Sequence, residues 1–127
     1  MDTENLAEPK TIGLTQGTKA KLERLKSDGY FKEMQDAYKF AVGLALASGG
    51  IANPLKNTTT VYGTGDLDQD RSLYEAVKAL RDNMTSENEA VYKTVERLAE
   101  WGINELSAMA ESGNIDFSSL MTKVSKT

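Results

Sequence analysis

The amino-acid sequence predicts a mainly α-helical fold that begins with one short strand. Through most of the chain, apolar residues recur every three or four positions, which is the period of the buried face of a helix. Residues 10–15 alternate apolar and polar side chains instead, a period typical of a half-buried strand. Turns that contain glycine, at residues 27–29, 49–50 and 112–114, separate the predicted helices. We therefore expect a strand and two helices, followed by a helical half of two to three helices.

The chain has 127 residues, which is the length of one domain with a modest core. A loop is expected at residues 51–65, and each half beside it is too small for an independent core. We therefore predict a single domain over residues 1–127, made of a flexible arm (1–9), a strand-helix-helix unit (10–50), a connecting loop (51–65) and a helical lobe (66–127).

The strand-helix-helix unit is the most informative part of the sequence. In its strand, Ile12 and Leu14 are expected to face inward. The outward positions are then Thr11, Gly13 and Thr15. A lone strand of this length is not stable in water, and the rest of the chain offers few strand candidates. We therefore expect it to pair with the same strand of a second chain, in a homodimer or a higher oligomer.

The helix boundaries of this unit follow from the residue types at their ends. Thr15 or Thr18 can cap the first helix, which is predicted to run to about Ser27. Either Ser27 or Asp28 can cap the second helix, and a glycine pair ends it. The second helix is apolar on most of its circumference, so it is predicted to be buried in a core or an interface.

The second half of the chain is predicted to be helical after one strand. Thr58–Tyr62 is a candidate edge or hairpin strand because its residues are largely β-branched. Helical spacing then predicts a helix from about Asp70 to Asn83. Ser86 and Glu89 form a capping box that predicts the start of the next helix. Asp116 can cap a last short helix.

The composition argues against catalysis and against a metal site. Without cysteine or histidine, the chain lacks thiolate chemistry, the commonest general base at neutral pH and the commonest ligand of catalytic zinc. Asp66, Asp68 and Asp70 imitate the first half of a calcium loop. The second half fails, because Arg71 stands where that loop needs glycine and Val77 where it needs glutamate. We expect a protein without enzyme activity, cofactor or metal, whose aspartates cap a helix.

Charge is distributed unevenly along the chain. The net charge is −4, which argues against simple nucleic-acid binding. Residues 10–39 nevertheless carry seven Lys or Arg against four Asp or Glu, whereas the other residues carry eight against fifteen. This excess of positive charge permits an anionic partner on one face, and a solvated helix face is the alternative interpretation. No apolar run is long enough to span a bilayer and the N-terminus is acidic, so we expect a cytoplasmic protein without membrane contact.

Two segments carry a resemblance to known families: IGLTQGTKAKLERLK and MQDAYKFAVGLALASG. In this order they resemble ribbon-helix-helix proteins, and also the DndE family of small proteins from bacterial DNA phosphorothioation systems. The resemblance covers the strand-helix-helix unit and implies DNA association without evident catalysis. In such proteins two strands pair into a ribbon that enters the major groove. The DNA-contacting residues that it implies are Lys10, Thr11, Gly13, Thr15, Lys19, Lys21, Lys26 and Lys32.

Two functions remain open from the sequence. The outward ribbon positions are threonine and glycine, which read base edges poorly, so contact is expected through lysines and the DNA backbone. The first function is a non-enzymatic, oligomeric, DNA-associated accessory protein, such as one of a prokaryotic DNA modification or defence system. The alternative is a protein-interaction module that docks a larger partner and makes no DNA contact.

Overall fold

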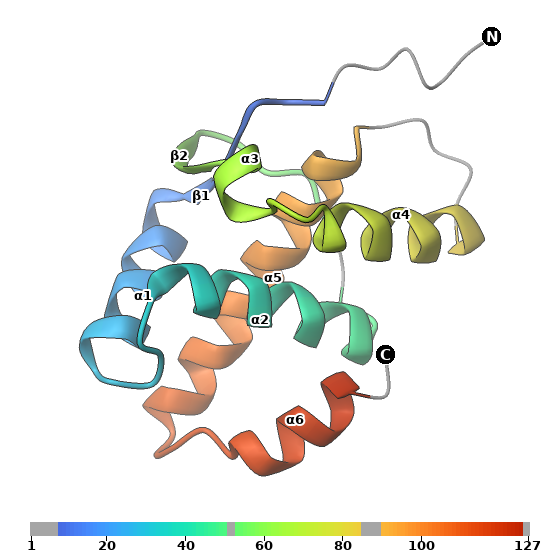
Figure 1. Cartoon of the computed structure of the whole chain (residues 1–127). Helices are drawn as coiled ribbons and strands as arrows, with labels where there is room; N and C mark the ends of the chain where they lie inside the picture. Colours follow the sequence, from blue (N-terminus) through green and yellow to red (C-terminus); the bar gives the residue numbers. More distant parts are fainter. Residues whose placement is uncertain (1–7, 51–52, 85–89, 126–127) are drawn as a thin grey trace, which may run out of the picture.

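The computed structural model describes residues 8–50, 53–84 and 90–125, and it confirms a mainly α-helical fold with one small sheet (Figure 1). Helix α5 (Val91–Glu111) lies centrally and contacts α1 (Gln16–Ser27), α2 (Met34–Ser48), α4 (Ser72–Met84) and β1 (Thr11–Thr15). None of the described helices is long and apolar enough to cross a membrane. The other elements are β2 (Thr58–Gly63), α3 (Thr64–Leu67) and α6 (Phe117–Ser125).

The strand-helix-helix unit has the predicted order, with one shifted boundary. Thr15 is the N-cap of α1, and α2 ends at Gly49, whose φ of 68° is left-handed. The start of α2 at Met34 differs from the prediction of a cap at residues 27–28. The intervening segment is a loop, and its Phe31 ring packs edge-on against Phe117 of α6, with ring centroids 5.4 Å apart. This contact ties the loop to the C-terminal helix.

The second half also follows the prediction in most elements. Both β2 and α4 lie where the sequence predicts a strand and a helix, while the short α3 between them was not predicted. The capping box at Ser86 and Glu89 lies outside the described residues, and α5 begins at Val91. Asp116 caps α6 as expected, because its carboxylate accepts the N–H of Ser119 at 3.2 Å.

The first described residues are docked on the helical lobe. The Glu8 carboxylate accepts the N–H groups of Val91 and Tyr92, both at 2.9 Å. A carboxylate is favourable there because the N-terminus of a helix carries partial positive charge. The carbonyl of Pro9 accepts the hydroxyl of Thr64 at 3.1 Å. These two residues are therefore held in place, in contrast to the flexible arm predicted for residues 1–9; residues 1–7 lie outside the described residues.

The expectation that β1 pairs with a second chain is wrong. It pairs antiparallel with β2 of its own chain, in a two-stranded sheet. Ile12 lies opposite Tyr62 and Leu14 opposite Thr59, with a bulge between these pairs that leaves Val61 without its own partner. The β-branched residues of β2 supply the partner that the short β1 needs.

The core is centred where α2 crosses α5, as the teal and orange ribbons of Figure 1 show. At the crossing, a Cβ atom on Gly102 would overlap the backbone carbonyl of Ala41, so the two helix backbones are in direct contact. Tyr38 of α2 is fully buried beside this crossing. The prediction that α2 is a buried helix is therefore confirmed. Its buried residues are Ala37, Tyr38, Ala41, Val42, Leu44 and Ala45.

Candidate functional site

The edge of β1 that faces away from β2 is closed by two glutamates of α5. The N–H of Gly13 donates to Glu96 Oε2 at 2.8 Å, and the N–H of Thr15 donates to Glu100 Oε1 at 3.1 Å. Glu96 is only 6% exposed, so its carboxylate is a buried acceptor. With β2 on one edge and these carboxylates on the other, β1 has no free edge for an intermolecular ribbon.

Glu100 also collects two hydroxyl groups at the start of α1. The hydroxyls of Thr15 and Thr18 donate to its Oε2 at 2.7 and 2.6 Å. Asn104, one turn further along α5, donates to the Thr18 hydroxyl at 3.1 Å. This network ties the start of α1 to α5, and it occupies the Thr15 hydroxyl that we expected to face DNA.

Tyr38 completes the network from the side of α2. Its hydroxyl donates to the carbonyl of Gly13 at 3.2 Å, so both backbone polar groups of Gly13 are bonded. Burial, and then the negative charge of Glu96, raise the pKa of Tyr38 well above its usual value. Tyr38 is therefore a neutral hydrogen-bond donor to the backbone of β1.

The sequence alone did not indicate a structural role for Glu96 and Glu100, because acidic residues on a helix are more often solvated surface charge. One signal was present in their spacing. Glu96, Glu100 and Asn104 follow at intervals of four, so they lie along one line of the helix, which is the arrangement expected for a polar row facing one partner.

The predicted DNA-contacting residues do not form one surface. Gly13 is buried beneath the backbone of Thr59, so the prediction that it faces outward is wrong. Thr15 and Lys19 are half-buried. The exposed members are Lys10, Thr11, Lys21, Lys26 and Lys32.

Helix α1 divides its cations between two flanks. Lys19 and Lys26 are seven positions apart, about two helical turns, so they share one flank. Lys21 lies on the other flank, where its ammonium group donates to Asn104 of α5 at 2.6 Å. Within the described residues, no carboxylate lies within ion-pair distance of Lys19 or Lys26. We call Lys19 and Lys26 the outer flank.

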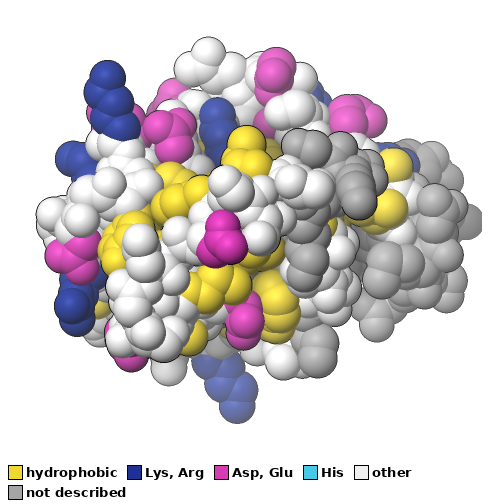
Figure 2. Space-filling model, turned by 90° about the horizontal axis from the view of Figure 1, so that it is seen from below, with side chains coloured by type: hydrophobic (Ala, Val, Ile, Leu, Met, Phe, Trp, Pro, Cys, Tyr) yellow, Lys and Arg dark blue, Asp and Glu magenta, His cyan; other side chains and the backbone are white. Residues whose placement is uncertain are grey.

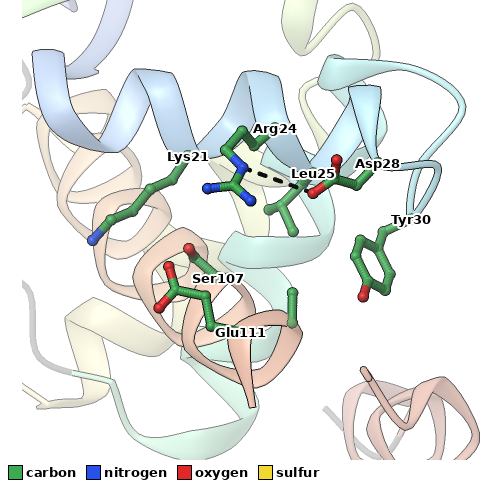
Figure 3. Close-up of a pocket in the computed structure, with 8 residues that line it drawn as sticks. Lys21, Arg24, Leu25, Asp28, Tyr30, Ser107 and Glu111 are labelled. Atoms are coloured by element: carbon green, nitrogen blue, oxygen red, sulfur yellow. Dashed lines mark ion pairs between the residues drawn. The ribbon is translucent and has the colours of Figure 1, made fainter. Parts of the chain in front are cut away.

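The flank of α1 that faces α5 lines a small hollow of about 60 Å³ (Figure 3). Arg24 there pairs with Asp28 at 3.8 Å, and Figure 3 shows Lys21 extending away from Arg24. Glu111 lines the other side. Because groups of both charges line so small a space, the hollow is not a uniformly positive site that would attract an anion.

Asp68 fulfils the capping role predicted for the aspartates before α4. Its carboxylate accepts the N–H groups of Leu73 and Tyr74, both at 2.9 Å, and the hydroxyl of Tyr92 at 2.8 Å. Among the described residues, no group of three or more acidic side chains could hold a metal ion.

The hydroxyl of Tyr62 is buried and has no hydrogen-bond partner among the residues that the structure describes. Burial and the charges of Asp36 and Glu33 raise the pKa of Tyr62 to about 12. A tyrosine with a raised pKa in the folded chain contributes stability below its unfolded pKa of about 10, and this contribution is lost as the pH rises through the folded value.

The change Tyr62→Phe is therefore expected to favour the folded state more at alkaline pH than at pH 7. At pH 7 the free energy of unfolding stays equal or rises slightly, because an unpaired buried hydroxyl is removed. Between about pH 10 and 12 the variant should lose less stability than the native chain. Urea unfolding at both pH values measures this, and an equal alkaline loss in the two proteins would contradict it.

Comparisons of the chain with models of protein families, with curated proteins and with solved structures find no match.

Proposed function

We propose that the protein is a non-enzymatic accessory protein that associates with duplex DNA through the phosphate backbone, as in a cytoplasmic DNA modification or defence system. The observation that carries this proposal is the outer flank of α1. Within the described residues its two ammonium groups have no carboxylate partner, and this supports their contact with an anionic ligand. Lys10 and Lys32, at the ends of the neighbouring elements, are exposed as well.

The manner of contact differs from insertion of a ribbon into the major groove. Because β1 lies between β2 and two glutamates of α5, a base-reading ribbon is not part of the proposal. Phosphate contacts by lysines position a protein on DNA and carry no direct sequence information. The proposal is therefore association without sequence preference.

Reversing the charge of the outer flank tests this function. The variant Lys19→Glu/Lys26→Glu is expected to bind a short duplex at least about tenfold more weakly at low salt, because it loses two phosphate contacts. The slope of log affinity against log salt should fall by about two. Fluorescence anisotropy over a salt series measures both quantities.

The matched control is Lys21→Glu/Arg24→Glu, which changes the net charge equally on the other flank of the same helix. It is expected to retain most of the affinity, because both groups already have partners, Asn104 and Asp28. Equal weakening by the two variants, or a native chain that ignores DNA at low salt, would overturn the proposal.

A surface near α6 favours the second function, docking of a protein partner. Among the described residues, Met121 of α6 is the large hydrophobic side chain that stands exposed to solvent, with 52% of its surface accessible. Figure 2 views the molecule from below and shows hydrophobic side chains gathered across the middle of that face, with single acidic groups among them. A native chain that binds no DNA at low salt would favour this function over the first.

A further inference from the structure

We propose that two copies of the chain pair antiparallel through the outer edge of β2, which joins their sheets into one of four strands. The sequence suggested β1 as the pairing strand. In the structure both edges of β1 are occupied, whereas no described residue occupies the outer edge of β2. The proposal is independent of DNA binding and concerns the strand at the opposite side of the sheet.

The direction of the backbone groups of β2 follows from those of β1. The N–H groups of Gly13 and Thr15 point to α5, so those of Ile12 and Leu14 point to β2. The residue opposite Leu14 is Thr59, whose backbone groups therefore point to β1. Those of the neighbouring Thr58 and Thr60 then point outward, where no described residue bonds them.

This outer edge lacks the usual protection against strand pairing. Natural edge strands carry lysine, proline or an inward charge that discourages a second strand. Thr58, Thr59 and Thr60 are uncharged, β-branched and exposed. The bulge at Val61 limits the edge on one side, so pairing is confined to the threonine segment.

The threonine segment is complementary to itself about a two-fold axis. With the axis at Thr59, Thr58 of each copy lies opposite Thr60 of the other, and both present outward N–H and C=O groups. Such a pair exchanges two hydrogen bonds, and cross-strand threonine pairs are favourable in antiparallel sheets. The same surface is used by both copies, as a closed dimer requires.

Charge at the two ends of β2 also suits an antiparallel pair. Lys56 precedes the strand, is exposed and has no described ion-pair partner. At the other end, Asp66 lies against Gly63, and the charges of Asp36 and Glu33 act on Tyr62. Antiparallel pairing brings the lysine of one copy towards the acidic end of its partner. This complementarity favours a second copy over an unrelated peptide strand.

Sedimentation of the full chain over a concentration series tests the dimer. The native chain is expected to dimerise reversibly, and Thr58→Lys/Thr60→Lys should weaken the dimer at least about tenfold, because like charges then face each other across the axis. Thr60→Pro removes an outward N–H without a charge and should weaken it similarly. Thr60→Val keeps the N–H and the branched side chain, so its dimer should resemble that of the native chain.

Hydrogen exchange identifies the surface directly and does not depend on the variants. The amides of Thr58 and Thr60 should be protected at high protein concentration and exchange freely at low concentration. A native chain that stays monomeric throughout would overturn the proposal. A dimer that persists in both disrupting variants, or that leaves these two amides unprotected, would overturn it as well.

Discussion

Replacing Gly102 with alanine is expected to lower the free energy of unfolding by about 3 kcal/mol or more. The added Cβ would overlap the backbone carbonyl of Ala41 on α2. A backbone atom cannot turn away as a flexible side chain can, so the helices α2 and α5 must move apart. That movement opens the interface that buries Tyr38 and its neighbours, and the lost packing adds to the strain. Urea unfolding followed by circular dichroism measures the change.

The change Gly17→Ala is a matched control of opposite sign. Gly17 lies in the exposed first turn of α1, where an added Cβ would meet nothing within 4 Å. Alanine is favoured over glycine in a helix by up to about 1 kcal/mol, so this variant should be as stable as the native chain or slightly more stable. If Gly102→Ala were tolerated equally well, the close contact of α2 with α5 would not exist in solution.

Truncating Glu96 to alanine is expected to cost about 2–3 kcal/mol of stability. The variant leaves the N–H of Gly13 without an acceptor at a buried position, and it removes a side chain packed between α5 and β1. Glu96→Gln should cost less, because its amide oxygen can still accept from Gly13. Unfolding in urea compares the two variants with the native chain.

Glu105→Ala supplies the control on the same helix. Glu105 is exposed, so its removal should change stability by less than about 0.5 kcal/mol. A loss for Glu96→Ala as small as that for Glu105→Ala would mean that the edge of β1 does not depend on the carboxylate.

The fold could be predicted from the sequence where local residue types determine local structure. Gly49 at the end of α2 and Asp116 before α6 act as their types predict, and Thr15 occupies the N-cap position of α1, although its hydroxyl bonds Glu100 and not a backbone N–H in the first turn of the helix. The apolar circumference of α2 correctly indicated a buried helix. These signals operate within a few residues, so one sequence is enough to detect them.

The pairing of β1 could not be predicted in the same way. Its true partner was recognised as a candidate strand, yet nothing local states that Leu14 lies opposite Thr59. The alternation of β1 also failed at Gly13, which is buried because the backbone of β2 approaches it closely. A partner far away in the chain determines both features, and such contacts leave no periodic signal.

The candidate site shows the same limit. A row of acidic residues on a helix is typical of a solvent-exposed face. Whether Glu96 and Glu100 are buried depends on which elements pack against them, and the sequence does not state this. For the lysines of α1, the sequence indicated an exposed helix but did not separate Lys21 from the outer flank. That division depends on where α5 lies, so it became apparent only from the contact between Lys21 and Asn104.

The closure of β1 by α5 has a consequence for how the chain is made. The groups that complete the β1 edge, at Glu96 and Glu100, follow Gly13 and Thr15 by 83 and 85 positions. During synthesis β1 leaves the ribosome before α5, so the bonds at its outer edge can form only after α5 has been made. Folding of the β1 edge therefore depends on residues that are synthesised much later.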